Sequence, residues 1–262
     1  MKVFLSSIEN GASVKDGTTL AQYFINEGVY MRYNLMSFYY LKGKYELAKM
    51  IKDHSEEVMI DSGAHSFHQG KKVNWLEYTK EYAKFIQEYD CPKVVGYFEM
   101  DIDPAGYPYE YVLELREILE SVSDKIIPVW HKNRGLEEFK KMCRDYSGRL
   151  IAITGFRNED IKDEQYIMFL KYAKKHNCIV HCLGMTRKSI LDKVPFDYVD
   201  SSSWKQSSIF GRINGHGKVT REFSKNKREV VFKENYIEAT KMATKYYEKW
   251  KNVCTYVDTK GE

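Results

Sequence analysis

Three aspartates stand where short apolar runs of the sequence end abruptly: Asp61, Asp101 and Asp200. Carboxylates act in enzymes as nucleophiles and as general acids or bases, so acids that meet in one place could carry a reaction. A single aspartate after a strand is as often the cap of the next helix or part of an Asx turn. Three of them, with His131 and Gly155 at the ends of further runs, favour a shared site.

The elements that would position these residues alternate regularly. Eight short runs rich in β-branched or aromatic residues are separated by segments whose apolar residues recur every three or four positions, the pattern of strands and amphipathic helices. The predicted strands cover residues 2–7, 29–38, 57–61, 93–101, 125–131, 149–155, 178–185 and 196–204. This rhythm predicts an α/β fold, a (β/α)8 TIM barrel formed by a single domain over residues 1–262, with a C-terminal helix.

A doubly wound open sheet is the competing layout, but no G-x-G-x-x-G motif follows the first predicted strand. In a parallel barrel the carboxyl ends of all strands meet at one rim, where the connecting loops converge. The barrel prediction therefore brings the aspartates together, and it makes a chemical role for them more plausible than three unrelated turns.

Composition limits the class of protein. With 262 residues, 43% of them hydrophobic, the chain can bury one large core, and no stretch approaches the roughly 18 to 20 apolar residues of a membrane span. Five cysteines favour a reduced compartment over a disulfide framework. We expect a cytoplasmic protein without a membrane partner. In the run Cys178-Ile-Val-His181-Cys182 the cysteines share one strand face and the histidine points to the other, so no metal site is expected there.

The stretch DSGAHSF, residues 61–67, resembles the D-S-G-G-F-Q signature of the tRNA-guanine transglycosylase superfamily. Further segments keep the order of that family: YFEMDIDP (97–104), IIPVWH (126–131), AITGF (152–156), CLGMTRKSILDKVPFDYVDSSSW (182–204) and FGRINGHG (210–217). The similarity extends from about residue 57 to 217. The chain lacks the family's C-x-C-x-x-C zinc cluster, and so it most resembles the short phage-type enzymes that insert 7-deazaguanines into DNA.

The resemblance implies an exchange of bases on a nucleotide, without a metal or another cofactor. Breaking the glycosidic bond needs a carboxylate that traps the sugar, as in retaining glycosidases, and Asp200 is the expected nucleophile. Asp61 is expected to move the proton, while Asp101, with Asp103 as second choice, accepts hydrogen bonds from the guanine edge. The other expected base contacts are Ser62, Gly63, His131, Gly155, Gly184 and Met185.

The implied partners are a 7-deazaguanine base and a nucleic acid, with DNA favoured over tRNA. A base inside a duplex cannot be reached, so the nucleotide must be flipped out or single-stranded. The net charge of only +4 requires a local basic patch, and we expect phosphate contacts from Arg212, Lys218 and Arg221 in the densest basic run. A charged surface loop is more often simply solvated.

Two other functions stay open on the sequence alone. The first is a hydrolase of a small N-glycoside or nucleoside, which needs two carboxylates but no basic rim. The second is a non-catalytic barrel that binds nucleic acid. The sequence leaves the number of subunits open, and a homodimer is compatible with it. If a phage encodes the protein, the host cytoplasm is its expected location.

Overall fold

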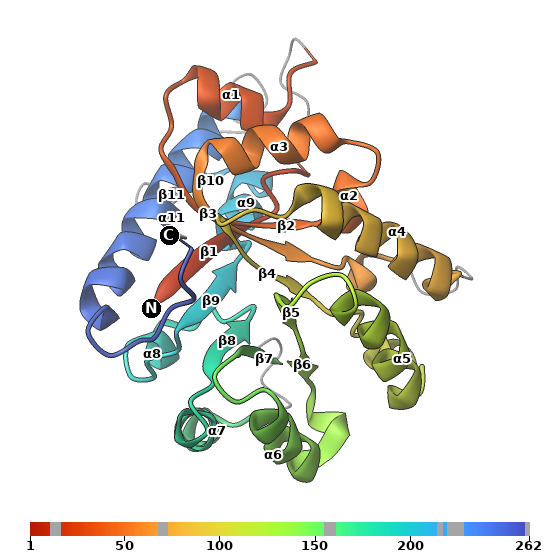
Figure 1. Cartoon of the computed structure of the whole chain (residues 1–262). Helices are drawn as coiled ribbons and strands as arrows, with labels where there is room; N and C mark the ends of the chain where they lie inside the picture. The colour runs from red at the N-terminus through yellow and green to blue at the C-terminus, as the bar shows by residue number, and fades with distance from the viewer. Residues whose placement is uncertain (11–16, 68–72, 155–160, 214–216, 219–227, 260–262) are drawn as a thin grey trace.

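The computed structural model describes residues 1–10, 17–67, 73–154, 161–213, 217–218 and 228–259. Its centre is a barrel of parallel strands with helices around it (Figure 1). The strands are β1 Lys2–Ser6, β2 Met31–Ser37, β3 Ser55–Asp61, β4 Val94–Phe98, β5 Ile126–Ile127, β6 Val129–Trp130, β7 Leu150–Thr154, β8 Ile179–Leu183 and β9 Tyr198–Ser201. The order β5-β4-β3-β2-β1-β9-β8-β7-β6 confirms the predicted (β/α)8 barrel.

Pro128 divides one predicted strand into two. Proline has no N–H for a strand ladder, so β5 ends before it and β6 begins after it. β5 pairs with β4, while β6 pairs with β7, so these two halves join the ends of the sheet. The N–H of Val129 donates instead to Oε1 of Glu99 at 2.8 Å. A buried carboxylate therefore satisfies the first N–H after the proline, at the point where the barrel closes.

Helices follow most strands and cover the outside of the barrel (Figure 1). They are α1 Leu20–Asn26, α2 Phe38–Leu41, α3 Tyr45–Asp53, α4 Trp75–Tyr89, α5 Tyr109–Glu120, α6 Gly135–Asp145, α7 Asp163–Lys175, α8 Lys188–Leu191, α9 Ser203–Ile209 and α11 Arg228–Trp250. The short 3-10 helices are η1 Ala64–Ser66, η2 Asp103–Ala105 and η3 Lys132–Arg134, and a hairpin joins β10 Arg212–Ile213 to β11 Gly217–Lys218. None of the described helices is both long and apolar enough to cross a membrane.

The alternation of residues along the strands separates two kinds of core. Inward-facing side chains fill the barrel, among them Phe4, Tyr33, Met59, Phe98, Ala152 and Tyr198. Outward-facing side chains pack under the surrounding helices in two further clusters. The strands are buried on both faces and so read as nearly continuous apolar runs, as expected for a parallel sheet.

The two ends of the described chain meet at the amino end of the barrel (Figure 1). The amino group of Met1 donates to the Tyr256 hydroxyl at 2.7 Å, and the N–H of Val257 donates to the Tyr198 hydroxyl at 2.8 Å. A cavity beside this tail is lined by Leu150, Tyr256 and their neighbours. It lies at the opposite end of the strands from the aspartates, so that the two features are separate.

Candidate functional site

The carboxyl ends of the strands bring the predicted site residues to one rim. Asp61 ends β3, Asp101 follows β4, His131 follows β6, and Asp200 lies in β9. Since β3 and β4 are neighbours in the barrel, and β9 lies beside β1, these acids come from the ends of different strands and share one rim. Burial raises the pKa of Asp61, and the charges of Asp101 and Asp200 raise it further.

Asp200 is held by three hydrogen-bond donors. Its Oδ1 accepts from Nε2 of His181 at 3.0 Å and from the N–H of Gly184 at 2.8 Å, and its Oδ2 accepts from Oγ of Ser6 at 3.1 Å. The side chain remains 14% exposed. A carboxylate that is fixed in orientation and still open to the rim is suited to attack a bound substrate.

His181 is a site residue that the sequence did not reveal as such. It is fully buried inside the barrel, where its ring lies edge-on to Phe98 with centroids 5.1 Å apart. Cys178 and Cys182 lie on the other face, in the cluster under the helices, as the strand alternation indicates. The alternation of residues along the strand predicts that His181 points into the barrel. The contact of His181 with Asp200 could not be predicted in this way, because it depends on the pairing of β8 with β9.

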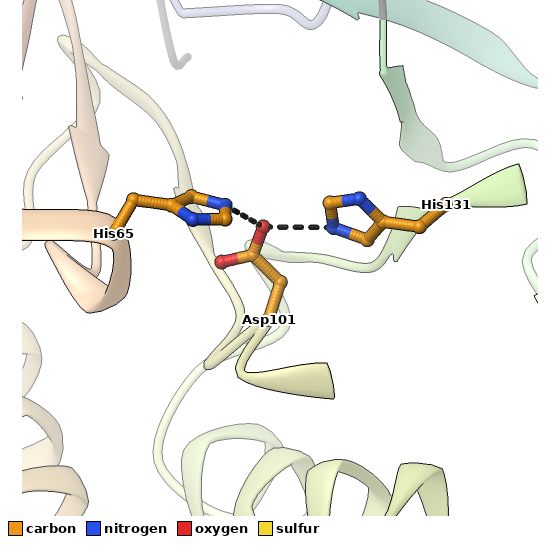
Figure 2. Close-up of side chains that lie close together, drawn as sticks. All are labelled: His65, Asp101 and His131. Carbon is orange, nitrogen blue, oxygen red and sulfur yellow. Dashed lines mark hydrogen bonds and ion pairs between the residues drawn. The ribbon is translucent and has the colours of Figure 1, made fainter. Parts of the chain in front are cut away.

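Asp101 forms the centre of a cluster with two histidines. Nε2 of His65 lies 3.0 Å and Nε2 of His131 lies 2.9 Å from the same Oδ2 atom of Asp101, and Figure 2 shows the rings approaching this oxygen from opposite sides. The Asp101 charge raises the pKa of His65 to about 9. Burial works against ionisation of Asp101, but the histidines hold its pKa well below the usual range. His65 was not predicted as a site residue.

Among the described residues, His65, Asp101 and His131 are a cluster of side chains that could hold a metal ion. Their ligand atoms all lie within 4.8 Å of one another. No metal site was predicted at these residues, because the local motifs that suggest zinc in the sequence contain cysteines. His65 follows β3 and His131 follows β6, so the two histidines are 66 positions apart in the chain. No short sequence motif contains both of them.

Asp61 sits in a different environment from Asp101. Burial and the neighbouring charge of Asp101 raise its pKa to about 6. Its Oδ2 accepts a hydrogen bond from the N–H of Gly63 at 2.9 Å. Gly63 has a φ of +80°, and a Cβ atom there would lie 2.5 Å from Cβ of Tyr39, so only glycine fits. The buried Ser62 accepts from the Tyr78 hydroxyl at 2.7 Å through its carbonyl oxygen.

Asp103 is occupied by a neighbouring arginine. Nε and Nη2 of Arg134 donate to its two oxygens at 2.9 and 2.5 Å, and Nδ2 of Asn133 adds a contact at 3.0 Å. Arg134 also reaches Oε1 of the buried Glu99 at 3.1 Å, and Arg116 pairs with the other oxygen of Glu99. Burial opposes this ionisation, yet the arginine lowers the pKa of Asp103. The network fixes the two short helices behind the Asp101 cluster.

Glu9 is a buried acid near the rim that was not predicted as a site residue. It is buried after β1, and its Oε1 accepts from the N–H of Ser37 at 3.1 Å, while Oε2 has no hydrogen-bond partner among the described residues. Burial raises the pKa of Glu9 to about 7. No pattern marks it, because it lies in a loop between two elements rather than at a strand end.

The other residues predicted to bind the base or the nucleic acid are partly buried in the core, partly on the surface and partly outside the described residues. Met185 is 1% exposed and packs in the core under the helices, while Gly184 reaches the rim through its N–H. Arg212 is exposed in β10, opposite Lys218 of β11. Gly155 and Arg221 lie outside the described residues. Phe210, next to Arg212, is 67% exposed.

Comparison with known proteins shows the fold. No family model matches the chain, and no curated protein matches it. Among solved structures, a proposed fructose-1,6-biphosphate aldolase from Coccidioides immitis superposes with a TM-score of 0.56 at 12% identity, over 96% of this chain and 93% of that one. At this identity the likeness concerns the barrel architecture alone.

Proposed function

We propose that the protein is a transglycosylase that exchanges guanine in a polynucleotide, DNA rather than tRNA, for a 7-deazaguanine. The observation that carries the proposal is the pairing on one rim of two carboxyl groups in opposite environments. Asp200 is oriented by three donors and open to the rim, while Asp61 has a pKa of about 6. A carboxylate held in orientation by donors, beside a carboxyl group with a raised pKa, is an arrangement that suits a nucleophile and an acid–base partner.

In the proposed reaction, Asp200 attacks C1′ of the nucleotide as the bond from C1′ to the guanine nitrogen breaks. Asp61 gives its proton to the departing guanine, leaving a sugar bound to Asp200 as an ester. The incoming 7-deazaguanine then loses its N–H proton to Asp61 and attacks C1′, which releases the Asp200 carboxylate. A pKa near 6 lets one carboxyl group donate in the first half and accept in the second.

Asp101 is the proposed reader of the base. Its carboxylate is kept ionised by the two histidines, so it is an acceptor for the N1–H and 2-amino donors of guanine. In the described residues both side-chain hydrogen bonds of Asp101 end on Oδ2, which leaves Oδ1 for the base. Asp103 does not compete well for this role because Arg134 engages both of its oxygens.

The surface next to Asp200 supports a polymeric substrate. α9 begins two residues after β9 and ends beside the exposed Phe210, and the exposed Arg212 follows in β10. An aromatic ring can stack on an unpaired base, and an arginine can contact phosphate, so this pair suits a strand that delivers a nucleotide to the rim.

The test is to incubate the protein with radiolabelled guanine and either double-stranded DNA, single-stranded DNA or tRNA, and to measure label in the polymer. Label in DNA supports the proposal. Label in tRNA alone overturns the choice of polymer. Release of free base from nucleosides, with no label in either polymer, favours the N-glycoside hydrolase instead.

The matched variants are Asp200→Asn and Asp192→Asn. Asp192 is likewise a hydrogen-bonded aspartate, since its Oδ1 accepts from Nζ of Lys249 at 3.1 Å, but it lies at the end of α8, away from the rim. Asp200→Asn should abolish incorporation while circular dichroism stays unchanged, and Asp192→Asn should retain it. Activity of Asp200→Asn within about tenfold of the unaltered protein would exclude Asp200 as nucleophile, since loss of a catalytic nucleophile costs orders of magnitude.

A further inference from the structure

The geometry points to a binding site for a divalent transition-metal ion, of the class of Zn²⁺ or Fe²⁺, formed by His65, Asp101 and His131. This inference goes beyond the proposed base exchange, in which no step uses a metal. It stands on the placement of the three side chains and on the chemistry of their donor atoms, and it holds or fails independently of the transglycosylase proposal.

The donor set selects the kind of ion. Imidazole nitrogens bind zinc, iron, copper and nickel, whereas calcium and magnesium prefer sites made of oxygen atoms. Two histidines with one carboxylate form the set found in non-haem iron oxygenases, and two histidines with a glutamate hold catalytic zinc. A site of this composition therefore favours a transition metal over the hard cations that accompany phosphates.

The separations already suit coordination. Metal bonds of about 2.0 to 2.2 Å at angles of 90 to 110° place neighbouring ligand atoms roughly 3 to 3.5 Å apart. Nε2 of His65 and Nε2 of His131 lie 3.0 and 2.9 Å from Oδ2 of Asp101, so two of the three separations are already in this range. One ligand atom from each of the three residues lies within 4.8 Å of the other two, so that the histidines need to approach each other only slightly around an ion. An ion would replace the two hydrogen bonds, and the exposed imidazole of His65 can turn toward it by side-chain rotation alone.

The surroundings hold two of the three ligands in place. Asp101 is 4% exposed, and His131 immediately precedes η3, whose Arg134 and Asn133 are tied to Asp103. Such supporting contacts orient metal ligands and raise affinity for the ion.

The third ligand leaves the site open. The His65 side chain is 59% exposed, and it covers only one side of Asp101, as Figure 2 shows. Structural zinc sites are closed by four protein ligands, whereas sites with three ligands keep positions for water or substrate. The cluster therefore corresponds to an ion that meets solvent or a bound molecule. If base exchange also occurs, Oδ2 of Asp101 would bind the ion, while Oδ1 remains for the base.

The experiment measures metal binding on the full chain, without base or polynucleotide. Protein stripped with EDTA and dialysed is titrated with Co²⁺, followed by visible absorption, and with Zn²⁺, followed by calorimetry. We expect one ion per chain. His65→Gln and His131→Gln should each lower the affinity by more than the roughly 10- to 100-fold that loss of a supporting contact costs. His54→Gln is the matched control, because His54 is an exposed histidine at the end of α3.

Each outcome decides the inference. Saturable binding that His65→Gln weakens, and His54→Gln leaves unchanged, supports the site. Absence of saturable binding in the unaltered protein, or equal affinity in His65→Gln, overturns it and leaves a hydrogen-bonded cluster around Asp101. His65 is exposed and its replacement should not disturb folding, so this variant decides the question even if His131→Gln fails to fold. The metal titration does not measure base exchange. Failure of the proposed function would be seen in the label-incorporation assay, and failure of the metal site in the titration.

Discussion

Replacing Asp61 by asparagine should make the protein more stable at pH 8 while slowing the proposed base exchange. The carboxyl group is half-buried beside Asp101, and both burial and that neighbouring charge disfavour its ionised form. Asparagine has almost the same shape and can still accept the 2.9 Å hydrogen bond from the N–H of Gly63. The substitution therefore removes the cost of an ionised group and leaves the local packing in place.

The magnitude follows from the pKa. A value of about 6 in the folded protein, against about 3.9 for an unperturbed aspartate, corresponds to about 3 kcal/mol. Screening by solvent at this half-buried position reduces the expected effect to about 2 kcal/mol. The folded state keeps the proton longer than the unfolded state, so the unaltered protein loses stability as pH rises from about 4 through about 6. Asp61→Asn does not undergo this loss.

The assay is urea unfolding at pH 4, 6 and 8 in buffer with EDTA, which keeps the histidine cluster free of metal. Asp61→Asn should match the unaltered protein at pH 4 and exceed it at pH 8. Asp103→Asn is the control of opposite sign, because Arg134 lowers the pKa of Asp103 and the variant should lose stability at pH 8. An Asp61→Asn variant that is less stable at pH 8 would refute this reasoning. Loss of nucleic-acid binding, rather than of exchange alone, would make Asp61 a recognition or structural residue.

Three further outcomes are expected. The affinity of Arg212→Ala for a guanine-containing oligonucleotide is measured across a salt series. The slope of log affinity against log salt concentration should become flatter by about 0.7 to 0.9, because one fewer counterion is released on binding. An unchanged slope would mean that the exposed Arg212 does not contact phosphate. Glu99→Gln should lower the free energy of unfolding by about 3 to 5 kcal/mol, measured in urea, because it leaves the cationic Arg116 with no carboxylate in that buried network. Gly63→Ala should cost about 2 to 5 kcal/mol in the same assay, since a methyl group meets Tyr39 in a backbone conformation that alanine disfavours; a smaller loss would show that the turn can relax.

Much of the fold could be predicted from the sequence because its signals are local. Short apolar runs alternate with amphipathic segments, and every predicted strand is present, including the run 125–131, which Pro128 divides. Once the strands are parallel, the ends that carry Asp61, Asp101 and Asp200 must share one rim. This step requires no knowledge of which strands are neighbours, and so the composition of the rim was accessible from residue order alone.

The contacts within the rim were not accessible in that way. Ser6 and Asp200 are 194 positions apart, and they meet because closure of the barrel places β1 beside β9. His65 reaches Asp101 only because β3 and β4 are neighbours and η1 turns back over the rim. No periodicity within a segment encodes such pairs, since each depends on two loops that are positioned by different strands.

The pKa values of the rim aspartates also depend on the tertiary structure. Asp61 and Asp103 are the same residue type within one stretch of the rim, yet the first has a raised pKa and the second a lowered one. Burial and the neighbouring charge of Asp101 raise the pKa of Asp61, whereas at Asp103 the opposing effect of burial is outweighed by Arg134 of η3. The sequence by itself determined that Asp61, Asp101 and Asp200 stand on one rim. Only the packed structure decided that the pKa of Asp61 is raised and that of Asp101 is lowered, because burial and charge interactions depend on distances through space and not on distances along the chain.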